Sequence, residues 1–183
     1  MSEASIELAR LKAAEKALEI IAGLRPRVIG IGTGSTIDKF IDLLPKAADR
    51  LKDSIYVCAS LYTTYRVKAL GYTVAPSSAI DSIDIYIDGA DEVDQHLNMV
   101  KGGGGALTLE KVLAYASHKR IYIVDYMKLV PSLCYRHPIP IEVLKEALSI
   151  VYTKLKQLGL NPVIRKSSTC LLYTSDAADE RSS

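Results

Sequence analysis

The sequence predicts an α/β protein with a doubly wound, mostly parallel sheet, followed by the start of a second, smaller α+β domain. Short and nearly all-apolar segments alternate with helical segments along the first 130 residues, a pattern typical of parallel strands covered on both faces. Polar or glycine-rich turns follow several of these strands. Beyond Pro131 the alternation stops and prolines become frequent.

The elements of the sheet follow one another in a regular order. Apolar residues between charged ones predict a helix over residues 5–24, which Pro26 ends. Later helices are predicted at 37–44, 62–70 and 106–117. Strands are predicted at 27–31, 55–58, 72–75, 83–87 and 120–124. This order is Rossmann-like, and we assign residues 1–130 to a catalytic domain of that type.

The remainder of the chain divides into two parts. A proline-punctuated edge segment at 137–143, a helix at 144–158 and a strand at 162–165 predict the first, incomplete part of a small α+β domain over 131–165. Residues 166–183 show no helical or strand periodicity after Tyr173 and are rich in Ser and Asp. They look like a translated cloning scar. We interpret them as a non-native or disordered tail, the alternative being a natural flexible tail.

Composition restricts the class of protein and its partners. Hydrophobic residues make up 49% and charged residues 24%, and the formal net charge is only +2, which does not favour a nucleic-acid partner. Charged residues interrupt every apolar run before the ~18 residues that span a bilayer, so no membrane partner is expected. The N-terminus has no signal-peptide pattern, which predicts a cytoplasmic location. The three cysteines include no C-x-x-C pair, and we expect no metal and no cofactor.

A loop rich in hydroxyl groups follows the first strand. Gly32-Thr33-Gly34-Ser35-Thr36 can bring backbone amides close to an anion at the start of the next helix, and its hydroxyl groups are further donors. The alternative is a tight turn in which Ser35 or Thr36 only caps the helix. The loop lacks the lysine of a P-loop and the third glycine of a dinucleotide-binding motif.

Four acids lie within seven residues at the end of the fourth strand, in Asp88-Gly89-Ala90-Asp91-Glu92-Val93-Asp94. Their spacing is not that of a calcium loop. Carboxylates accept hydrogen bonds from sugar hydroxyls, so Asp88 and Asp91 are candidates for binding a polyol. For Glu92 and Asp94 we favour a solvated turn.

A run of four glycines follows a lysine in Lys101-Gly102-Gly103-Gly104-Gly105. Ordering four glycines costs chain entropy, so close approach of the backbone to a ligand explains them better than a linker does. Glu110 lies about one turn inside the following helix, where it could face the loop; the alternative is a surface acid paired with Lys111 or His118. Lys128 adds a cation after the fifth strand.

Together these motifs resemble the type A ribose-5-phosphate isomerases over about residues 5–165. The segments that carry the resemblance, in family order, are 32–36, 88–92, 101–104, 108–111, 125–128 and 138–143. The resemblance implies that Glu110 is the catalytic base, that Lys101, Asp88 and Asp91 assist it, and that Lys128 supplies positive charge. It also implies that the substrate is bound by Thr33, Gly34, Ser35, Thr36, Asp88, Gly89, Ala90, Asp91, Lys101, Gly102, Gly103, Gly104 and Lys128.

The resemblance implies a reaction of the non-oxidative pentose phosphate pathway, the interconversion of D-ribose 5-phosphate and D-ribulose 5-phosphate through an enediolate. One carboxylate can move the proton between C2 and C1. The resemblance also implies a homo-oligomer, a dimer or a tetramer, if the chain is full length. The alternatives are a phosphosugar-binding regulatory module, a coenzyme A transferase-like enzyme and a sugar-phosphate deaminase.

Two departures from the family pattern have consequences. Residues 59–64, Ala-Ser-Leu-Tyr-Thr-Thr, stand where the family usually has a stretch with Ser and Asp. The family also continues for several tens of residues past 165, so we expect this chain to be unstable or inactive although its site residues are present.

Overall fold

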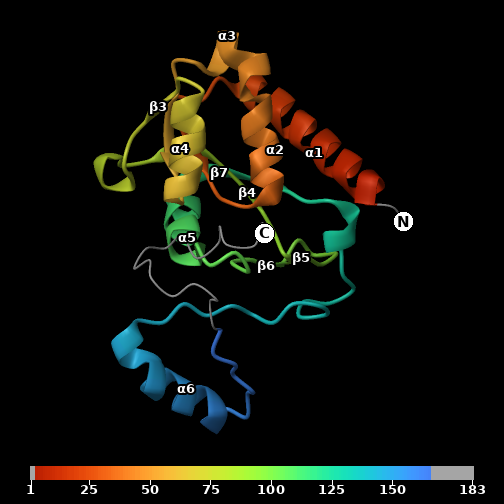
Figure 1. Ribbon diagram of the computed structural model, residues 1–183, viewed down its shortest axis with the longest axis vertical. Helices are drawn as coiled ribbons and strands as arrows, with labels where there is room; N and C mark the ends of the chain where they lie inside the picture. The colour runs from red at the N-terminus through yellow and green to blue at the C-terminus, as the bar shows by residue number, and fades with distance from the viewer. Residues whose placement is uncertain (1–2, 166–183) are drawn as a thin grey trace.

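The computed structural model describes residues 3–165, which contain one five-stranded parallel sheet and a two-stranded antiparallel ribbon (Figure 1). The order in the large sheet is β3-β2-β1-β4-β7. Its strands are β1 (Val28–Ile31), β2 (Ile55–Cys58), β3 (Thr73–Val74), β4 (Ile83–Gly89) and β7 (Ser117–Ile123). The ribbon pairs β5 (Glu92–Val93) with β6 (Met99–Val100). The strand order reverses direction between β1 and β4, and ligands of doubly wound sheets bind at such a point.

Helices cover both faces of the large sheet, as the fold class requires. They are α1 (Glu3–Leu24), α2 (Ser35–Leu43), α3 (Ala48–Leu51), α4 (Leu61–Ala69) and α5 (Leu107–Tyr115), with short 3₁₀ turns η1 (Leu44–Ala47), η2 (Ser77–Ala79) and η3 (Tyr126–Lys128). Ile29 and Ile87 are fully buried against α1 and α2, whereas Tyr86 packs in a second core with Leu113 of α5. No helix within residues 3–165 is long and apolar enough to cross a membrane.

The predicted fold class is confirmed, but two predicted elements differ from the structure. The last strand of the sheet begins at Ser117 rather than at residue 120, because Ser117 pairs with Ile83 and its hydroxyl bonds the carbonyl of Leu113 at the end of α5. The strand predicted at 162–165 is wrong, since these residues form no strand. Their backbone finds no neighbouring strand to pair with among the described residues.

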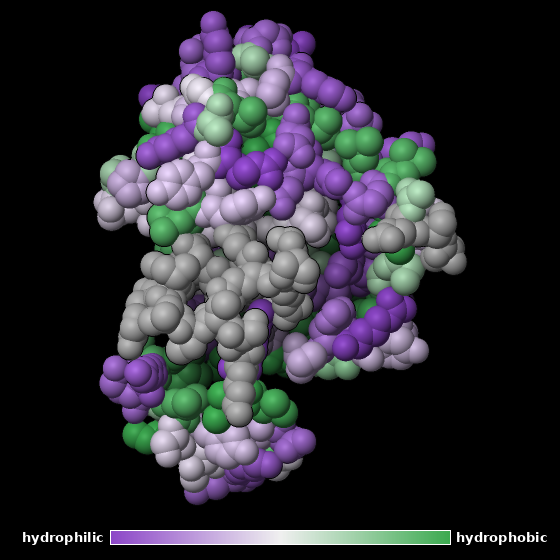
Figure 2. All heavy atoms as spheres, viewed as in Figure 1, coloured by the Kyte–Doolittle hydropathy of each residue, from purple (hydrophilic) through white to green (hydrophobic). Residues whose placement is uncertain are grey.

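The segment after Val130 runs away from the sheet to η4 (Lys145–Ala147) and α6 (Leu148–Gln157), which lies apart from the other helices (Figure 1). Green hydrophobic surface shows beside purple hydrophilic surface in this part of the molecule (Figure 2). The exposed apolar side chains here are Ile139, Ile141, Leu144, Leu148, Ile150, Leu158, Leu160, Val163 and Ile164. The predicted tail, residues 166–183, lies outside the described residues.

Two of the hydrogen bonds that connect this segment to the rest of the chain lie at the glycine loop. The Glu142 carboxylate accepts the backbone N–H of Thr108 at 3.1 Å, at the start of α5. The Arg165 guanidinium donates to the carbonyl of Gly103 at 2.8 Å. Both contacts fall on or beside the glycine loop, so this segment borders the edge of the sheet where a ligand is expected.

Candidate active site

A cavity of about 120 Å³ lies at the carboxyl ends of β1 and β4, where the strand order reverses. All the residues singled out from the sequence as site residues line it. They are Thr33, Gly34, Ser35, Thr36, Asp88, Gly89, Ala90, Asp91, Lys101, Gly102, Gly103, Gly104, Glu110 and Lys128, joined by Arg10 and Ile37. Segments far apart in the sequence therefore meet at one place.

The centre of the cavity is a chain of buried charges. The Lys101 ammonium lies 2.7 Å from the Asp88 carboxylate and 3.7 Å from that of Glu110, and it also donates to the carbonyl of Gly89. Only 1% of Asp88 and 5% of Glu110 are exposed to solvent. Glu110 does not pair with Lys111 or His118; it faces the glycine loop instead. One cation between two buried carboxylates is a device for fixing charge at a reacting centre.

Asp88 accepts hydrogen bonds from three groups of the protein. Besides Lys101, the buried Tyr86 hydroxyl donates to its Oδ2 at 2.6 Å and the Gly89 N–H donates to its Oδ1 at 2.7 Å. The Lys101 ammonium also lies 5.3 Å from the centre of the Tyr122 ring, a favourable cation–π distance. Asp88 therefore stabilises the positive charge of Lys101.

The surroundings of Glu110 change its acidity. Burial raises the pKa of Glu110, and the negative charge of Asp88 raises it further, while Lys101 lowers it; the result is about 7. For Lys101, burial acts to lower the pKa, but Asp88 and Glu110 outweigh that effect and raise it. Near neutral pH, therefore, Glu110 can both accept and release a proton while Lys101 stays charged.

The glycine loop packs closely against side chains elsewhere in the protein. Gly102 has a φ of +90°, and a Cβ placed there would lie 2.5 Å from the Leu107 side chain. The N–H of Gly103 donates to the Asp91 carboxylate at 2.8 Å. Asp91 is half-buried and lines the cavity, and this contact fixes its direction.

The loop after β1 presents free amides to the cavity. Gly34 is the N-cap of α2, with a φ of 119°, and no side chain caps this helix. The alternative in which Ser35 or Thr36 serves as the cap is therefore wrong. Ser35 and Thr36 line the cavity beside the start of α2, where unpaired N–H groups favour an anion.

Arg10 was missed from the sequence. It comes from α1, its Nε lies 3.0 Å from the Asp125 carboxylate, and it lines the cavity together with Lys128. Asp125 is 3% exposed and also accepts the N–H of Met127 at the start of η3, so it orients both Arg10 and the turn that carries Lys128. A lone arginine on an amphipathic helix gives no local signal of this contact.

The solvated turn predicted for Glu92 is wrong. Glu92 is fully buried, and its carboxylate accepts the backbone N–H groups of Tyr135, Arg136 and His137 at 3.2, 2.5 and 2.8 Å. Burial acts to raise the pKa of Glu92, but these N–H groups outweigh it and lower the pKa. Asp94 does form a turn, accepting from the N–H groups of His96 and Asn98.

A larger hollow of about 390 Å³ opens at the opposite edge of the sheet, near Arg27, Asp84 and Lys119. Its one carboxylate, Asp84, accepts the N–H groups of Arg27 and Val28 at 2.7 and 2.9 Å. It contains no buried acid–base pair, so we place the reaction in the smaller cavity.

Comparison with known proteins identifies the family that carries this arrangement. The family described as ribose 5-phosphate isomerase A (phosphoriboisomerase A) matches residues 55–178. The ribose-5-phosphate isomerase A of Bordetella bronchiseptica is 42% identical over 157 residues, which are 85% of this chain and 68% of that protein. This chain belongs to the type A ribose-5-phosphate isomerase family.

Solved structures of type A ribose-5-phosphate isomerases agree. A D-ribose-5-phosphate isomerase in complex with phospho-erythronic acid is 38% identical with a TM-score of 0.77, over 84% of this chain and 67% of that one. The enzyme from Neisseria gonorrhoeae is 41% identical with a TM-score of 0.74, over 84% of this chain and 66% of that one. The chain thus spans about two thirds of the length of its relatives.

Type A ribose-5-phosphate isomerases interconvert ribose 5-phosphate and ribulose 5-phosphate, so membership confirms the resemblance that the motifs indicated. It does not favour the regulatory module or the coenzyme A transferase-like enzyme. The segment that departs from the isomerase pattern, 59–64, lies next to the site: Ser60 and Thr63 contact the loop after β1.

Proposed function

We propose that this chain interconverts D-ribose 5-phosphate and D-ribulose 5-phosphate, with Glu110 as the base that moves the proton. The observation that carries the proposal is the buried Glu110 carboxylate, 3.7 Å from the Lys101 ammonium, in a cavity lined by hydroxyl groups and cations. Membership of the isomerase family supports the choice of substrate. That a relative binds phospho-erythronic acid, a phosphorylated sugar acid, supports the choice as well.

The chemistry needs one base that serves two carbons. In the open-chain aldose, Glu110 removes the proton from C2, the C2 electrons form the C1–C2 double bond, and O1 becomes an oxyanion. The proton on O2 passes to O1, the C1–C2 double-bond electrons take the proton of Glu110 at C1, and the electrons of O2 form the C2 ketone. A pKa of about 7 suits both steps near neutral pH.

Lys101 is our candidate for stabilising the oxyanion. Its ammonium is fixed between Asp88 and Glu110, so it needs no rearrangement when negative charge develops on the substrate. Asp91 is the better candidate for moving the proton that opens the sugar ring. It is half-buried at the cavity, whereas Asp88 is 1% exposed and has its hydrogen bonds filled by Tyr86, Gly89 and Lys101.

The phosphate end of the substrate is assigned to the loop Thr33–Thr36 and to two cations. The start of α2 offers uncapped amides, and Ser35 and Thr36 offer hydroxyl groups. Lys128 and Arg10 face this part of the cavity from η3 and α1. The remaining lining groups, Gly89, Ala90 and Gly102–Gly104, are assigned to the sugar.

Conversion of ribose 5-phosphate by the purified chain, followed in an assay coupled to ribulose 5-phosphate, tests the proposal. Absence of turnover in a chain that unfolds cooperatively would contradict it. Turnover together with a cooperative thermal transition would refute the expectation that this chain is unstable or inactive.

The pH dependence of kcat/KM is expected to report Glu110. The base must be ionised, so kcat/KM should be constant well above pH 7 and fall about tenfold per pH unit well below it, with an apparent pKa of about 7. Asp88 raises this pKa, so Asp88→Asn should move the acid limb to lower pH. A kcat/KM that stays constant between pH 5 and 8 would contradict the assignment of Glu110 as the base.

The raised pKa of Glu110 also means that the folded state binds the Glu110 proton more tightly than the unfolded state does. The free energy of unfolding should therefore fall as pH rises from 4.5 to about 7.

We further propose that residues 131–165 form the first, incomplete part of a small α+β domain, that the protein is a homo-oligomer, a dimer or a tetramer, if the chain is full length, and that it is cytoplasmic. The exposed apolar side chains between Ile139 and Ile164 support an assembly, because a large exposed apolar surface is unfavourable in water. Light scattering of the purified chain should give the mass of two or four copies, and a monomer at micromolar concentration would contradict it. Cell fractionation tests the location.

A further inference from the structure

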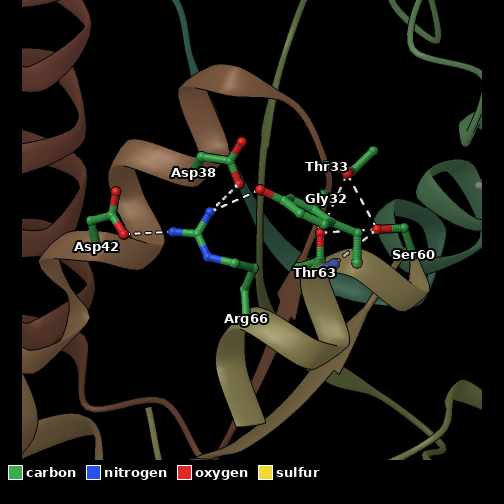
Figure 3. A network of polar contacts seen from close by, with 8 residues as sticks. Gly32, Thr33, Asp38, Asp42, Ser60, Thr63 and Arg66 are labelled. Carbon is green, nitrogen blue, oxygen red and sulfur yellow. Dashed lines mark hydrogen bonds and ion pairs between the residues drawn. The ribbon is translucent and has the colours of Figure 1, made fainter. Parts of the chain in front are cut away.

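Three hydroxyl groups meet beneath the loop after β1, two of them from the segment that departs from the isomerase pattern (Figure 3). Ser60 precedes α4 and Thr63 lies in its first turn; they are 3% and 1% exposed. The Ser60 hydroxyl lies 3.2 Å from that of Thr33 and 3.1 Å from that of Thr63. The Thr63 and Thr33 hydroxyls are 3.3 Å apart.

Each hydroxyl group has one proton to donate, which limits the hydrogen bonds that the three groups can form with one another. The Thr63 hydroxyl lies 3.1 Å from the carbonyl of Gly32, which can only accept, so Thr63 donates there. The Ser60 oxygen accepts the N–H of Thr63 at 3.1 Å and has one proton of its own to give. Two arrangements are then open. In the first, Ser60 donates to Thr63 and Thr33 can donate to Ser60. In the second, Ser60 donates to Thr33.

A bound anion favours the second arrangement, in which Ser60 donates to Thr33. Thr33 lines the cavity, so its proton can turn toward a bound phosphate, which only accepts. Ser60 then donates to the Thr33 oxygen, while Thr63 keeps its bond to Gly32. Chains of hydrogen bonds polarise one another, so a Thr33 that accepts from Ser60 is a better donor to the ligand.

Helix α4 is held in place relative to the loop by a second set of contacts. The Arg66 guanidinium lies 3.1 Å from the Asp38 carboxylate and 2.5 Å from that of Asp42, both on α2, and it donates to the Tyr62 hydroxyl at 3.0 Å (Figure 3). Because α2 begins directly after the loop, these ion pairs join α4, which carries Thr63, to the helix that follows the loop.

We propose that Ser60 and Thr63 are positioning residues that orient the Thr33 hydroxyl as a donor to the phosphate of the substrate. The inference rests on the proposed function for the identity of the ligand, a sugar phosphate. It adds two residues outside the cavity lining to the groups that decide how tightly the phosphate is bound.

The test measures binding rather than turnover. The dissociation constants of ribose 5-phosphate and of inorganic phosphate are determined by calorimetry for the unchanged chain and for Ser60→Gly, which removes the hydroxyl that donates to Thr33 and keeps a residue that helix N-caps accept. Loss of one neutral hydrogen bond should weaken both about 3- to 10-fold. Ser60→Thr, which keeps the hydroxyl, should restore binding. Where turnover is measurable, KM should rise with kcat unchanged.

Two further variants distinguish positioning from a general loss of stability. Thr64→Val is the matched control, because Thr64 lies on the same helix but donates to the carbonyl of Ser60 instead of the loop; its binding should not change. In a Thr33→Val background, Ser60→Gly should cause no further loss, since the hydroxyl that Ser60 orients is gone.

Unchanged binding in Ser60→Gly, an equal loss in Thr64→Val, or an additive loss in the Thr33→Val background would overturn the inference, and so would absence of phosphate binding to the unchanged chain. Binding without any isomerase turnover would contradict the proposed function and leave the positioning result intact.

Discussion

Glu110→Gln is expected to lower kcat at least about 10²-fold, the usual contribution of a positioned general base. Glutamine keeps the shape and the hydrogen-bonding reach of the side chain toward Lys101 but cannot accept the C2 proton. The expected loss is in kcat, with KM for ribose 5-phosphate changed much less, because the substrate is held mainly by its phosphate and hydroxyl groups. The coupled assay at pH 8, where Glu110 is ionised, gives both values.

Glu142→Gln is the matched control for this experiment. Glu142 lies in the segment after Val130, where its carboxylate accepts the N–H of Thr108 at the start of α5, and it does not line the cavity. Its replacement should leave kcat within about twofold and change the unfolding temperature little, as surface substitutions usually do. Near-unchanged turnover in Glu110→Gln would remove Glu110 from its role.

Lys101→Met should have two large effects. The oxyanion loses its donor, which we expect to lower kcat/KM by about 10²- to 10³-fold. Asp88, 1% exposed, is left as a buried charge without its cation, which typically costs about 3–5 kcal/mol of unfolding free energy. The bonds from Tyr86 and Gly89 place the expected cost at the lower end of that range. Denaturant unfolding and the coupled assay measure the two effects separately.

The double variant Asp88→Asn with Lys101→Met separates stability from catalysis. Asparagine removes the unpaired charge and can still accept from the Tyr86 hydroxyl, so most of the lost unfolding free energy should return. Activity should stay low, because the donor to the oxyanion is still missing. Recovery of activity together with stability would mean that Lys101 acts only by neutralising Asp88.

The sequence was sufficient to predict the sheet and the cavity lining because both depend on local signals. Apolar strands such as 83–87 are recognisable by composition, and the loops after them meet at one edge in any parallel sheet. The roles of these residues remain predictions. The start of β7 was less predictable, since Ser117-His-Lys-Arg is polar. Within residues 3–165 this strand pairs only with β4, so polar side chains are tolerated at its other edge.

The features that were missed depend on contacts between distant residues. Arg10 reaches Asp125 across 115 positions, and Glu92 is buried only because the backbone at 135–137 closes over it. Ser60 and Thr63 lie 27 to 31 positions from the loop that they contact. Composition and spacing carry no signal of such pairs.

The position of Gly32 has a consequence for anyone who varies this enzyme. A Cβ placed on Gly32 would lie 2.1 Å from the Asp88 carboxylate, so no larger residue fits while the aspartate is present. Asp88 in turn holds Lys101, and through it the charge around Glu110. In a combinatorial library, positions 32, 88 and 101 should therefore be randomised together, because a side chain at position 32 requires a change at position 88, and position 88 in turn decides what can stand at position 101.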